Sequence, residues 1–510
     1  MGEQSAYDVF LEHAARQPNA IALLTAGKLA TTYGEFSAHV RSLRRRLAAR
    51  GVGRGSRVGL LVNTRDAMAT AYFAVISCAT AVPLSTSSTD GEIAFDLEDF
   101  EVGAVLIEHS AEPRLFDAAK KAGVELVCVT PDSRRTGFIH LDGDEGTAAE
   151  EPERPRPDDV LALLHTSGTT GRPKVIPMTQ ISRVLEAANF SPPVRLSSAD
   201  RCLNAMPLHH GQGLVGEFQN VLLQGASVAF APFDARRFVS QVEECRATTF
   251  TLVPAMHQAV VEAIGDRTAV FLGGAVRYVR STSAMLPLTL LRDMRAAYGV
   301  PIIQQYAASE CGIIAMTEFD ESLNRGGAVG RVVREDAAIM DDNGNILPAG
   351  APGEICVKES PLVITRYENN PDADAEAFRD GWYRTGDGGY IDEDGYLFLT
   401  GRVREVINRG GEKISPAEVD EVLMCHTGVA MAAAFGVPDS RFGQEVMAAV
   451  VARHGVSLDP EEVRAHASER LSYGKVPKKV FIVLELPLNA TGKIMRSQLA
   501  AWLGPGEPEQ

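Results

Sequence analysis

The chain has 510 residues, which is too many for one hydrophobic core, so two or three domains are expected. Its apolar fraction of 45% and charged fraction of 23% are typical of an ordinary soluble globular protein. The net charge is −16 and no long basic run is present, which argues against a nucleic acid held through its phosphates.

The cysteines indicate a reducing compartment. They are scattered without a C-x-x-C pair, at positions 78, 128, 202, 245, 311, 356 and 425. Together with an N-terminus that lacks a secretory signal, this pattern predicts a cytoplasmic protein. The uncharged stretch 67–89 is rich in Ala, Ser and Thr and contains Pro83, so we expect a core helix packed on a sheet rather than a membrane span.

The first part of the chain alternates helical and strand patterns. Thr32 and Glu35 fit a capping box before an amphipathic helix that ends near Gly51. The expected elements that follow are a strand at 57–62, a helix at 67–80, a strand at 104–107, a helix at 112–122 and a strand at 125–129. Buried strands that alternate with helices predict a parallel α/β sheet.

The middle of the chain continues this alternation after an interruption. Residues 130–159 are polar and are interpreted as a surface loop or linker. Further elements are expected as strands at 160–164, 227–230, 249–252, 277–281 and 301–305, with helices at 236–245 and 288–298.

The last part has a different texture. Short strands and turns such as "DDNGN" and "DEDGY" predict a β-rich subdomain at about 325–402. From residue 403 to 510 we expect a small α+β domain, in which Ser415 caps a helix that begins at Pro416. The predicted fold is therefore α/β, with a large N-terminal domain of stacked sheets at 1–402 and a smaller C-terminal domain.

A loop rich in glycine and hydroxyl groups follows the strand at 160–164. In "TSGTTGRPK" the residues Ser167, Gly168, Thr169, Thr170 and Gly171 precede Lys174. Backbone N–H groups, hydroxyls and a lysine suit a phosphate. The spacing is not that of a Walker loop, and such a turn by itself is more often only a turn.

Five further motifs follow in order. They are "MPLHHGQG" (206–213), "QQYAASE" (304–310), "YRTGDGGY" (383–390), "GRVREVINRGGEKISPAEVD" (401–420) and "NATGKIMR" (489–496). With "SGTTGRPK" (167–174) they resemble the ordered motifs of the adenylate-forming superfamily, over nearly the whole chain. "NRGGEKISPAEVD" is most similar to the acyl-CoA synthetase branch, near the oxalate- and coumarate-CoA ligases.

The resemblance implies an ATP-dependent acid–thiol ligase with ATP, Mg²⁺ and CoA as cofactors. It implies phosphate binding by the 167–171 loop and Lys174, adenine stacking on Tyr306, and a hydrogen bond from Ser309 to the α-phosphate. Glu310 would hold Mg²⁺, and Asp387 with Arg402 would bind the ribose. Taken singly, these residues also fit a core tyrosine, a solvated glutamate and a turn aspartate.

The resemblance also implies a moving C-terminal domain. Lys493 would act on the carboxylate and α-phosphate in one orientation. After rotation about a hinge near Arg404, Gly411 would lie beside the pantetheine path. His210 would lie between the acyl pocket and the thiol tunnel. We expect His209 and His210 to point to opposite faces of a strand, which disfavours a two-histidine metal site.

The acid is indicated only by composition. The expected acyl pocket is lined by Gly211, Gly213, Leu214, Gly216, Ser283, Ala284, Met285, Ala307 and Ala308. These residues are small or apolar and include no arginine for a second carboxylate. A bulky, mostly apolar monocarboxylic acid is therefore predicted in preference to oxalate.

Two departures from the family pattern leave alternatives open. Val175 follows Lys174 where the family usually has glycine, and Gln305 precedes Tyr306 where Gly or Ala is common. Valine is costly where φ is positive, so an enzyme that only thioesterifies an adenylate made by a partner enzyme is one alternative. Others are loading of a separate carrier protein and a catalytically dead adenylate-binding protein. A luciferase-like activity is possible on the fold, but no sequence feature favours it.

Overall fold

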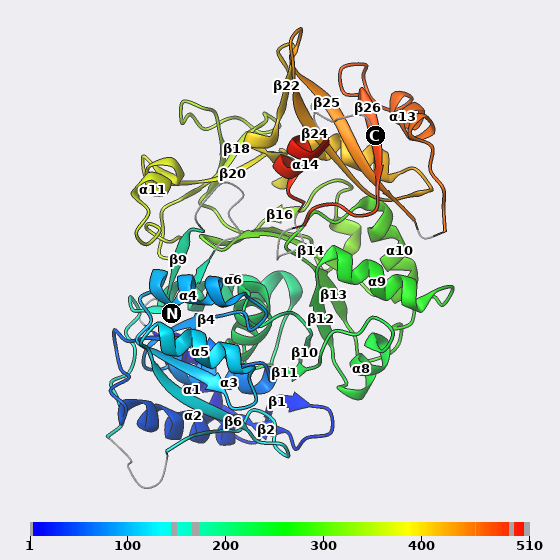
Figure 1. Cartoon of the computed structure of the whole chain (residues 1–510). Coiled ribbons are helices and arrows are strands. Elements are labelled where there is room, and N and C mark those ends of the chain that lie inside the picture. The colour runs from blue at the N-terminus through cyan, green and yellow to red at the C-terminus, as the bar shows by residue number, and fades with distance from the viewer. Residues whose placement is uncertain (1–3, 144–149, 166–172, 454, 489–493, 504–510) are drawn as a thin grey trace.

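The computed structural model describes residues 4–143, 150–165, 173–453, 455–488 and 494–503. The chain forms a large N-terminal part and a smaller C-terminal unit, which lies above it in Figure 1. Within the described residues the strands form sheets of fourteen, seven and five strands. This arrangement confirms the predicted mixed α/β fold with a large and a small domain.

The seven-stranded sheet has the order β7-β6-β5-β3-β4-β8-β9. Its central strands are parallel, whereas β7 and β9 pair antiparallel at the two edges. The strands are β3 (Arg57–Leu61), β4 (Thr80–Pro83), β5 (Ala104–Glu108), β6 (Glu125–Pro131), β7 (Ile139–Leu141), β8 (Val160–His165) and β9 (Val175–Thr179). Strand β7 lies within the stretch expected to be a loop at 130–159, so that prediction was wrong at this point.

Helices fill the space between this sheet and the fourteen-stranded one. Helix α3 (Arg65–Ile76) is buried along all but its first residue, and one core cluster joins it to strands of both sheets. The uncharged stretch is therefore a core helix, as expected. Also packed in this region are α1 (Ala6–Arg16), α2 (Tyr33–Ala48), α6 (Gln180–Val194), α7 (Asn220–Leu223) and the π-helix η1 (Gln212–Gln219). The other face of the seven-stranded sheet carries α4 (Asp90–Asp99) and α5 (Pro113–Lys121).

The fourteen-stranded sheet combines parallel and antiparallel strands. Its parallel part contains β1 (Ile21–Thr25), β10 (Arg201–Asn204), β11 (Ser227–Phe230), β12 (Thr249–Leu252), β13 (Tyr278–Ser281) and β14 (Ile302–Ala308), with the antiparallel strand β2 (Thr31–Thr32) at one edge. The outer helices are α8 (Phe238–Glu244), α9 (Pro254–Ile264) and α10 (Leu288–Tyr298).

Strand β14 is the junction between the two parts. It pairs in parallel with β13 up to Gln304 and antiparallel with β15 from Gln305. The antiparallel strands are β15 (Gly312–Met316), β16 (Gly330–Val332), β17 (Ala337–Met340), β18 (Gly353–Lys358), β19 (Phe378–Arg379), β20 (Trp382–Ile391) and β21 (Tyr396–Arg402), with η2 (Glu321–Leu323) and α11 (Pro371–Ala377) between them. The change of pairing places residues 305–310 at the border of the two parts.

The C-terminal unit is a five-stranded sheet with helices. It contains η3 (Val403–Glu405), β22 (Ile407–Arg409), β23 (Glu412–Ile414), β24 (Val429–Asp439), β25 (Gly443–Ala452), β26 (Lys479–Val483), α12 (Pro416–Met424), α13 (Pro460–Ser468) and α14 (Arg496–Leu503). Ser415 caps α12 by accepting a hydrogen bond from the Glu418 N–H, as predicted. The exact boundary at residues 402 and 403, and any motion of this unit, stay predictions.

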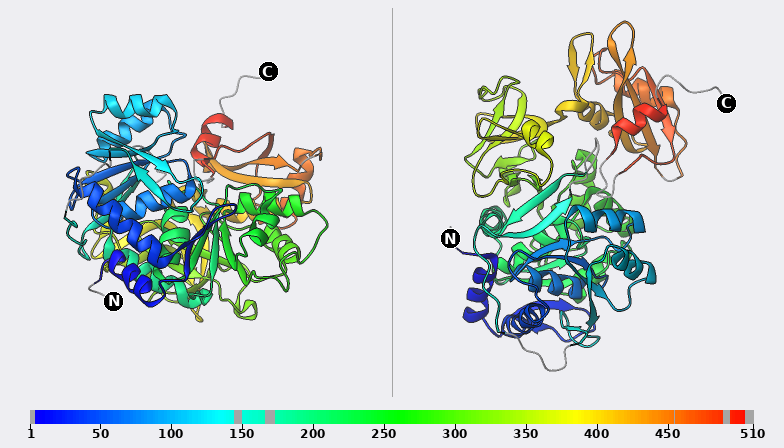
Figure 2. Two further views of the ribbon diagram at one scale, coloured as in Figure 1. Left: turned by 90° about the horizontal axis from the view of Figure 1, so that it is seen from below. Right: turned by 60° about the vertical axis from the view of Figure 1, so that its left-hand side comes forward.

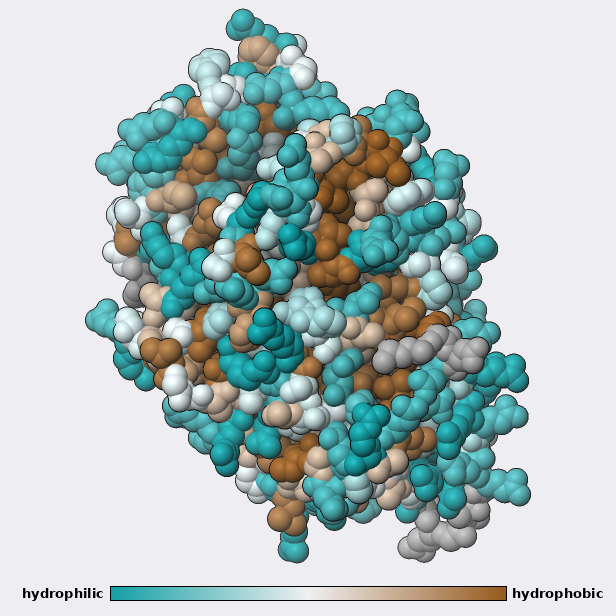
Figure 3. Space-filling view, turned by 180° about the vertical axis from the view of Figure 1, so that it is seen from behind, coloured by the Kyte–Doolittle hydropathy of each residue, from teal (hydrophilic) through white to brown (hydrophobic). Residues whose placement is uncertain are grey.

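We next consider the hydropathy of the surface and the lengths of the helices. The face seen from behind carries mostly hydrophilic residues, with apolar residues scattered between them (Figure 3). No helix formed by the described residues is long and apolar enough to cross a membrane.

Candidate active site

Tyr306, Asp387 and Arg402 form one contiguous group. The Tyr306 hydroxyl donates to Asp387 Oδ2 at 2.7 Å, and Arg402 Nε lies 2.9 Å from Asp387 Oδ1. Asp387 and Arg402 are direct partners across β20 and β21. Burial and the Asp387 carboxylate raise the pKa of Tyr306 well above its usual range, so the phenol stays protonated and donates. Three residues predicted to bind adenosine therefore meet in space.

Lys174 and Glu310 form a second group, joined by Tyr367. The Lys174 Nζ atom lies 4.6 Å from the centre of the Tyr367 ring, and the Tyr367 hydroxyl donates to Glu310 Oε1 at 2.9 Å. Glu310 is buried, at 8% exposure. A buried carboxylate with acceptor capacity left on its oxygens fits Mg²⁺, which prefers oxygen ligands.

The charges around Lys174 indicate that both groups border one site. Burial, the largest cause, lowers the pKa of Lys174, and the Glu310 carboxylate acts in the opposite direction. The charges of Arg404 and Arg402 add to the lowering. The arrangement therefore collects two arginines, a lysine and two carboxylates, charges that suit the phosphates of a nucleotide and a divalent cation.

The structure shows whether Val175 occupies a position that needs a positive φ. Residues 167–171 lie outside the described residues, so their predicted phosphate contacts stay predictions. Val175 is the first residue of β9, is 3% exposed and pairs with His165 of β8. It has no positive φ, and its carbonyl accepts a hydrogen bond from the Glu368 N–H. A β-branched residue suits this extended, buried position.

The two adjacent histidines do not lie on a strand, and this prediction was wrong. His209 and His210 follow Leu208 in a turn between β10 and η1, with ring centres 4.2 Å apart. A turn lets neighbouring side chains meet, whereas a strand would have separated them. Burial, together with the charges of His210 and Arg65, lowers the pKa of His209 to about 4. His209 is therefore neutral at pH 7.

Gln305 belongs to a buried polar network, not to the adenosine group. Its Oε1 accepts from Arg280 at 3.1 Å, and its Nε2 donates to the Thr282 hydroxyl at 3.0 Å. Arg280 forms an ion pair with Glu217, and both side chains are almost completely buried. Gln212 Nε2 donates to the same glutamate at 2.8 Å. Sequence reasoning missed this network, although a charged residue in each of two apolar segments was a signal for it.

The residues expected around the acid differ in packing and exposure. Gly213 is buried in η1, and a Cβ there would lie 2.3 Å from the Pro207 carbonyl oxygen, so this position requires glycine. Ser283 has a φ of 70°, which is unusual for a residue other than glycine. Ala284, Met285 and Ala307 are exposed. The remaining expected lining residues, Gly211, Leu214, Gly216 and Ala308, lie on or beside η1 and β14.

The residues predicted for the second half-reaction are more dispersed. Ser309 is exposed in the turn after β14, next to Glu310. Gly411 lies in the turn between β22 and β23, a hairpin that points away from the N-terminal part in Figures 1 and 2. Lys493 lies outside the described residues. Arg404 lies in η3 and pairs with Glu376 of α11, so this predicted hinge residue contacts the large domain.

The comparisons with known proteins agree with this architecture. A family model described as "AMP-binding enzyme" matches residues 10–367, and one described as "AMP-binding enzyme C-terminal domain" matches residues 418–493. The chain therefore belongs to the AMP-binding enzyme family, which confirms the resemblance drawn from its motifs.

Named relatives extend over nearly the whole chain. A probable CoA ligase CCL9 of Humulus lupulus is 36% identical and covers 94% of this chain and 93% of its own. An oxalate–CoA ligase of Arabidopsis thaliana is 34% identical, with 96% and 97% covered. The crystal structure of ATP-bound MatB from Rhodopseudomonas palustris has a TM-score of 0.89 at 27% identity, covering 98% of this chain and 99% of that one.

Proposed function

We propose that this protein is an acid–CoA ligase that activates its acid as an acyl-adenylate. The observation that carries the proposal is that the predicted binding residues form two connected groups. Tyr306, Asp387 and Arg402 form the group proposed to bind adenosine. Lys174 and Glu310, connected through Tyr367, form the group proposed to bind the phosphates and Mg²⁺. The names of the relatives, which are CoA ligases, support the same chemistry.

In the first step a carboxylate oxygen of the acid attacks the α-phosphorus of ATP, and pyrophosphate leaves. Lys174, Arg402 and Arg404 would balance the phosphate charge, and Glu310 would hold Mg²⁺, which would neutralise charge on the leaving phosphates. In the second step the thiol sulfur of CoA attacks the acyl carbon, and AMP leaves. Asp387 and Arg402 would retain the ribose through both steps.

The second step requires a different position of the C-terminal unit. In the described arrangement the hairpin that carries Gly411 points away from the N-terminal part (Figure 1). We propose that rotation near Arg404 exchanges Lys493 for Gly411 at the site, with Ser309 and His210 remaining on the large domain. The pair between Arg404 and Glu376 would break during this rotation.

The predicted pocket lining supports the class of acid, and the cysteines support the location. A bulky, mostly apolar acid remains our proposal from the predicted lining, and oxalate, the substrate named for two of the relatives, is the alternative to be tested against it. The free thiols of all seven cysteines support a cytoplasmic location.

A panel of acids tests this function. Each acid is given with ATP and Mg²⁺ and either CoA or a phosphopantetheinylated carrier protein, and pyrophosphate and thioester are measured separately. We expect thioester only with CoA. Thioester on the carrier protein alone would favour the carrier-loading alternative, and the absence of pyrophosphate with every acid would overturn the proposal.

A further inference from the structure

Tyr367 lies on a short segment that touches both sides of the phosphate region. The Ile364 N–H donates to the Glu310 carbonyl at 2.8 Å, and the Glu368 N–H donates to the Val175 carbonyl at 3.1 Å. The segment 364–368 is therefore bonded to the backbone of Glu310 at one end and to the backbone of Val175, next to Lys174, at the other. Its own backbone is held by Asp374, whose Oδ1 accepts from the Tyr367 N–H at 2.6 Å.

The Tyr367 side chain also contacts both sides, through Glu310 and Lys174. Its hydroxyl donates to Glu310 Oε1 at 2.9 Å, and its ring lies under the Lys174 amine at 4.6 Å. The side chain is 3% exposed. The bond leaves the second oxygen of Glu310 and the remaining lone pairs of Oε1 for a cation.

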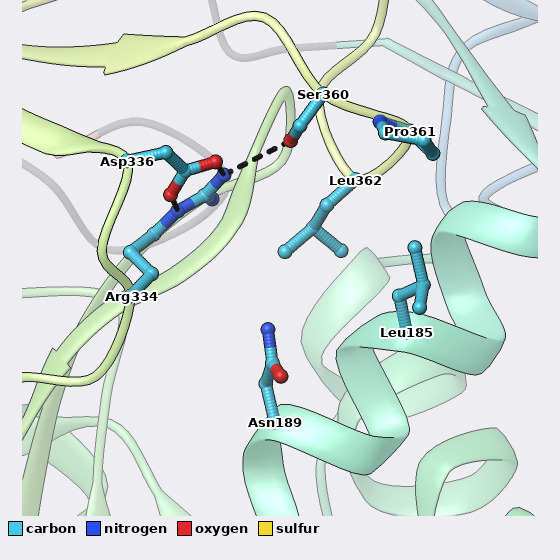
Figure 4. A pocket seen from close by; sticks show the side chains of 7 residues that line it. All are labelled: Leu185, Asn189, Arg334, Asp336, Ser360, Pro361 and Leu362. Carbon is cyan, nitrogen blue, oxygen red and sulfur yellow. Dashed lines mark hydrogen bonds and ion pairs between the residues drawn. The ribbon is translucent and has the colours of Figure 1, made fainter. Parts of the chain in front are cut away.

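A buried arginine, Arg334, contacts the backbone next to Glu310 and the loop before the 364–368 segment. Arg334 pairs with Asp336 through two nitrogens, lies 3.4 Å from the Ser360 hydroxyl and donates to the Cys311 carbonyl. Figure 4 shows Arg334, Asp336 and Ser360 together at one side of a small pocket, opposite Leu185 and Asn189 of α6. Cys311 follows Glu310 directly, so Arg334 bonds the backbone next to Glu310 and also contacts Ser360, in the loop that leads to the 364–368 segment.

We propose that Tyr367 is a positioning residue that orients the Glu310 carboxylate for Mg²⁺ and holds Lys174 over its ring beside the phosphate site. The inference rests on the proposed function for the identity of the cation and the phosphates. A hydrogen bond to one oxygen fixes the plane of a metal-binding carboxylate, and loss of such outer partners weakens metal binding. The cation–π contact restricts a flexible lysine before the nucleotide arrives.

Two substitutions separate the two roles. Tyr367→Phe retains the ring under Lys174 and removes only the bond to Glu310. Tyr367→Leu removes the aromatic face as well. Tyr396→Phe is the matched control, because its hydroxyl is bonded to the Leu323 carbonyl elsewhere in the N-terminal part.

Metal binding is measured directly and independently of turnover. Mn²⁺ is titrated into the full-length enzyme with α,β-methylene-ATP, and free Mn²⁺ is followed by electron paramagnetic resonance. We expect Tyr367→Phe to weaken Mn²⁺ binding about tenfold, with the Kd for the nucleotide without metal unchanged. Tyr367→Leu should also weaken nucleotide binding without metal. Tyr396→Phe should match the wild type.

The half-reactions provide the second measurement. Tyr367→Phe should require about tenfold more Mg²⁺ for half-maximal pyrophosphate formation, while the conversion of a synthetic acyl-adenylate to acyl-CoA stays at the wild-type rate. Unchanged Mn²⁺ binding in folded Tyr367→Phe would overturn the inference. If the wild type forms no pyrophosphate with any acid, the proposed function fails, but the Mn²⁺ titration still tests the role of Tyr367.

Discussion

Asp387 is bonded through both of its carboxylate oxygens, to the Tyr306 hydroxyl at 2.7 Å and to Arg402 Nε at 2.9 Å. The two partners come from β14 and β21, which are far apart in the sequence. A carboxylate held in this way has a fixed orientation, and its remaining lone pairs can accept from two neighbouring hydroxyls.

Asp387→Asn should therefore damage nucleotide binding. The amide loses the ion pair with Arg402 and one acceptor, and hydrogen bonds to charged groups contribute about 1.5–3 kcal/mol. We expect the KM for ATP to rise roughly 10- to 100-fold. Asp394→Asn, in the exposed turn between β20 and β21, is the control. A KM within about twofold of the wild type would contradict the role of Asp387.

Val175→Gly tests whether the valine impairs the phosphate loop. Val175 is buried on β9, so glycine removes apolar contacts there and raises the conformational entropy of the unfolded chain. We therefore expect the free energy of unfolding to fall by roughly 2–3 kcal/mol. The midpoint of thermal unfolding should fall, and the rate of pyrophosphate formation should not rise. Val456→Gly, at an exposed position, is the comparison. A large gain in adenylation rate would show that the valine obstructs the loop.

Gln305→Ala should affect the acid and not the nucleotide. The side chain contacts Arg280 and Thr282, not Asp387. We expect the KM for ATP to change less than about threefold, while the relative kcat/KM values across a panel of acids change by tenfold or more. Equal losses for all acids together with a raised KM for ATP would assign Gln305 to the nucleotide instead.

Buried histidines should make the protein sensitive to acid. His257 is fully buried, with Nε2 2.9 Å from the Arg280 carbonyl and Nδ1 3.1 Å from the Tyr298 hydroxyl, and burial lowers its pKa from 6.5 to about 4. The unfolded chain therefore binds more protons between pH 6.5 and 4. Stability is highest above this range and falls as the pH decreases through it, by roughly 3 kcal/mol from this residue.

Urea unfolding at several pH values measures this effect. The slope of stability against pH between 6.5 and 4 should be smaller in His257→Gln than in the wild type. His39 and His209 also have pKa values lowered to about 4, so part of the slope should remain. An unchanged slope in a folded His257→Gln variant would contradict the claim that burial lowers the pKa of His257.

The sequence allowed much of the fold and part of the site to be predicted, for identifiable reasons. Helix α2 and its capping box followed from Thr32 and Glu35, and the parallel strands followed from short apolar runs. The turn at His209 was missed because it depends on the π-helix that follows, which has no simple periodic signal. Strand β7 was missed because its three residues become a strand only by pairing with β6.

The contact of Tyr367 with Glu310 and the pairing of Arg280 with Glu217 were also missed from the sequence. The partners are 57 residues apart for Tyr367 and Glu310 and 63 residues apart for Arg280 and Glu217, and only the tertiary fold brings them together. The departure at Val175 had suggested a weak first half-reaction. Its place on a regular strand removes the backbone argument for that alternative.

The most direct measurement follows the two half-reactions side by side. A panel of acids is supplied with ATP, Mg²⁺ and CoA, and the corresponding synthetic acyl-adenylates are supplied with CoA alone, with pyrophosphate and acyl-CoA measured separately. A complete ligase should carry out both reactions with the same acid. If acyl-CoA forms only from the synthetic adenylate, the first step is lost, and the central claim that this chain adenylates its own acid is wrong.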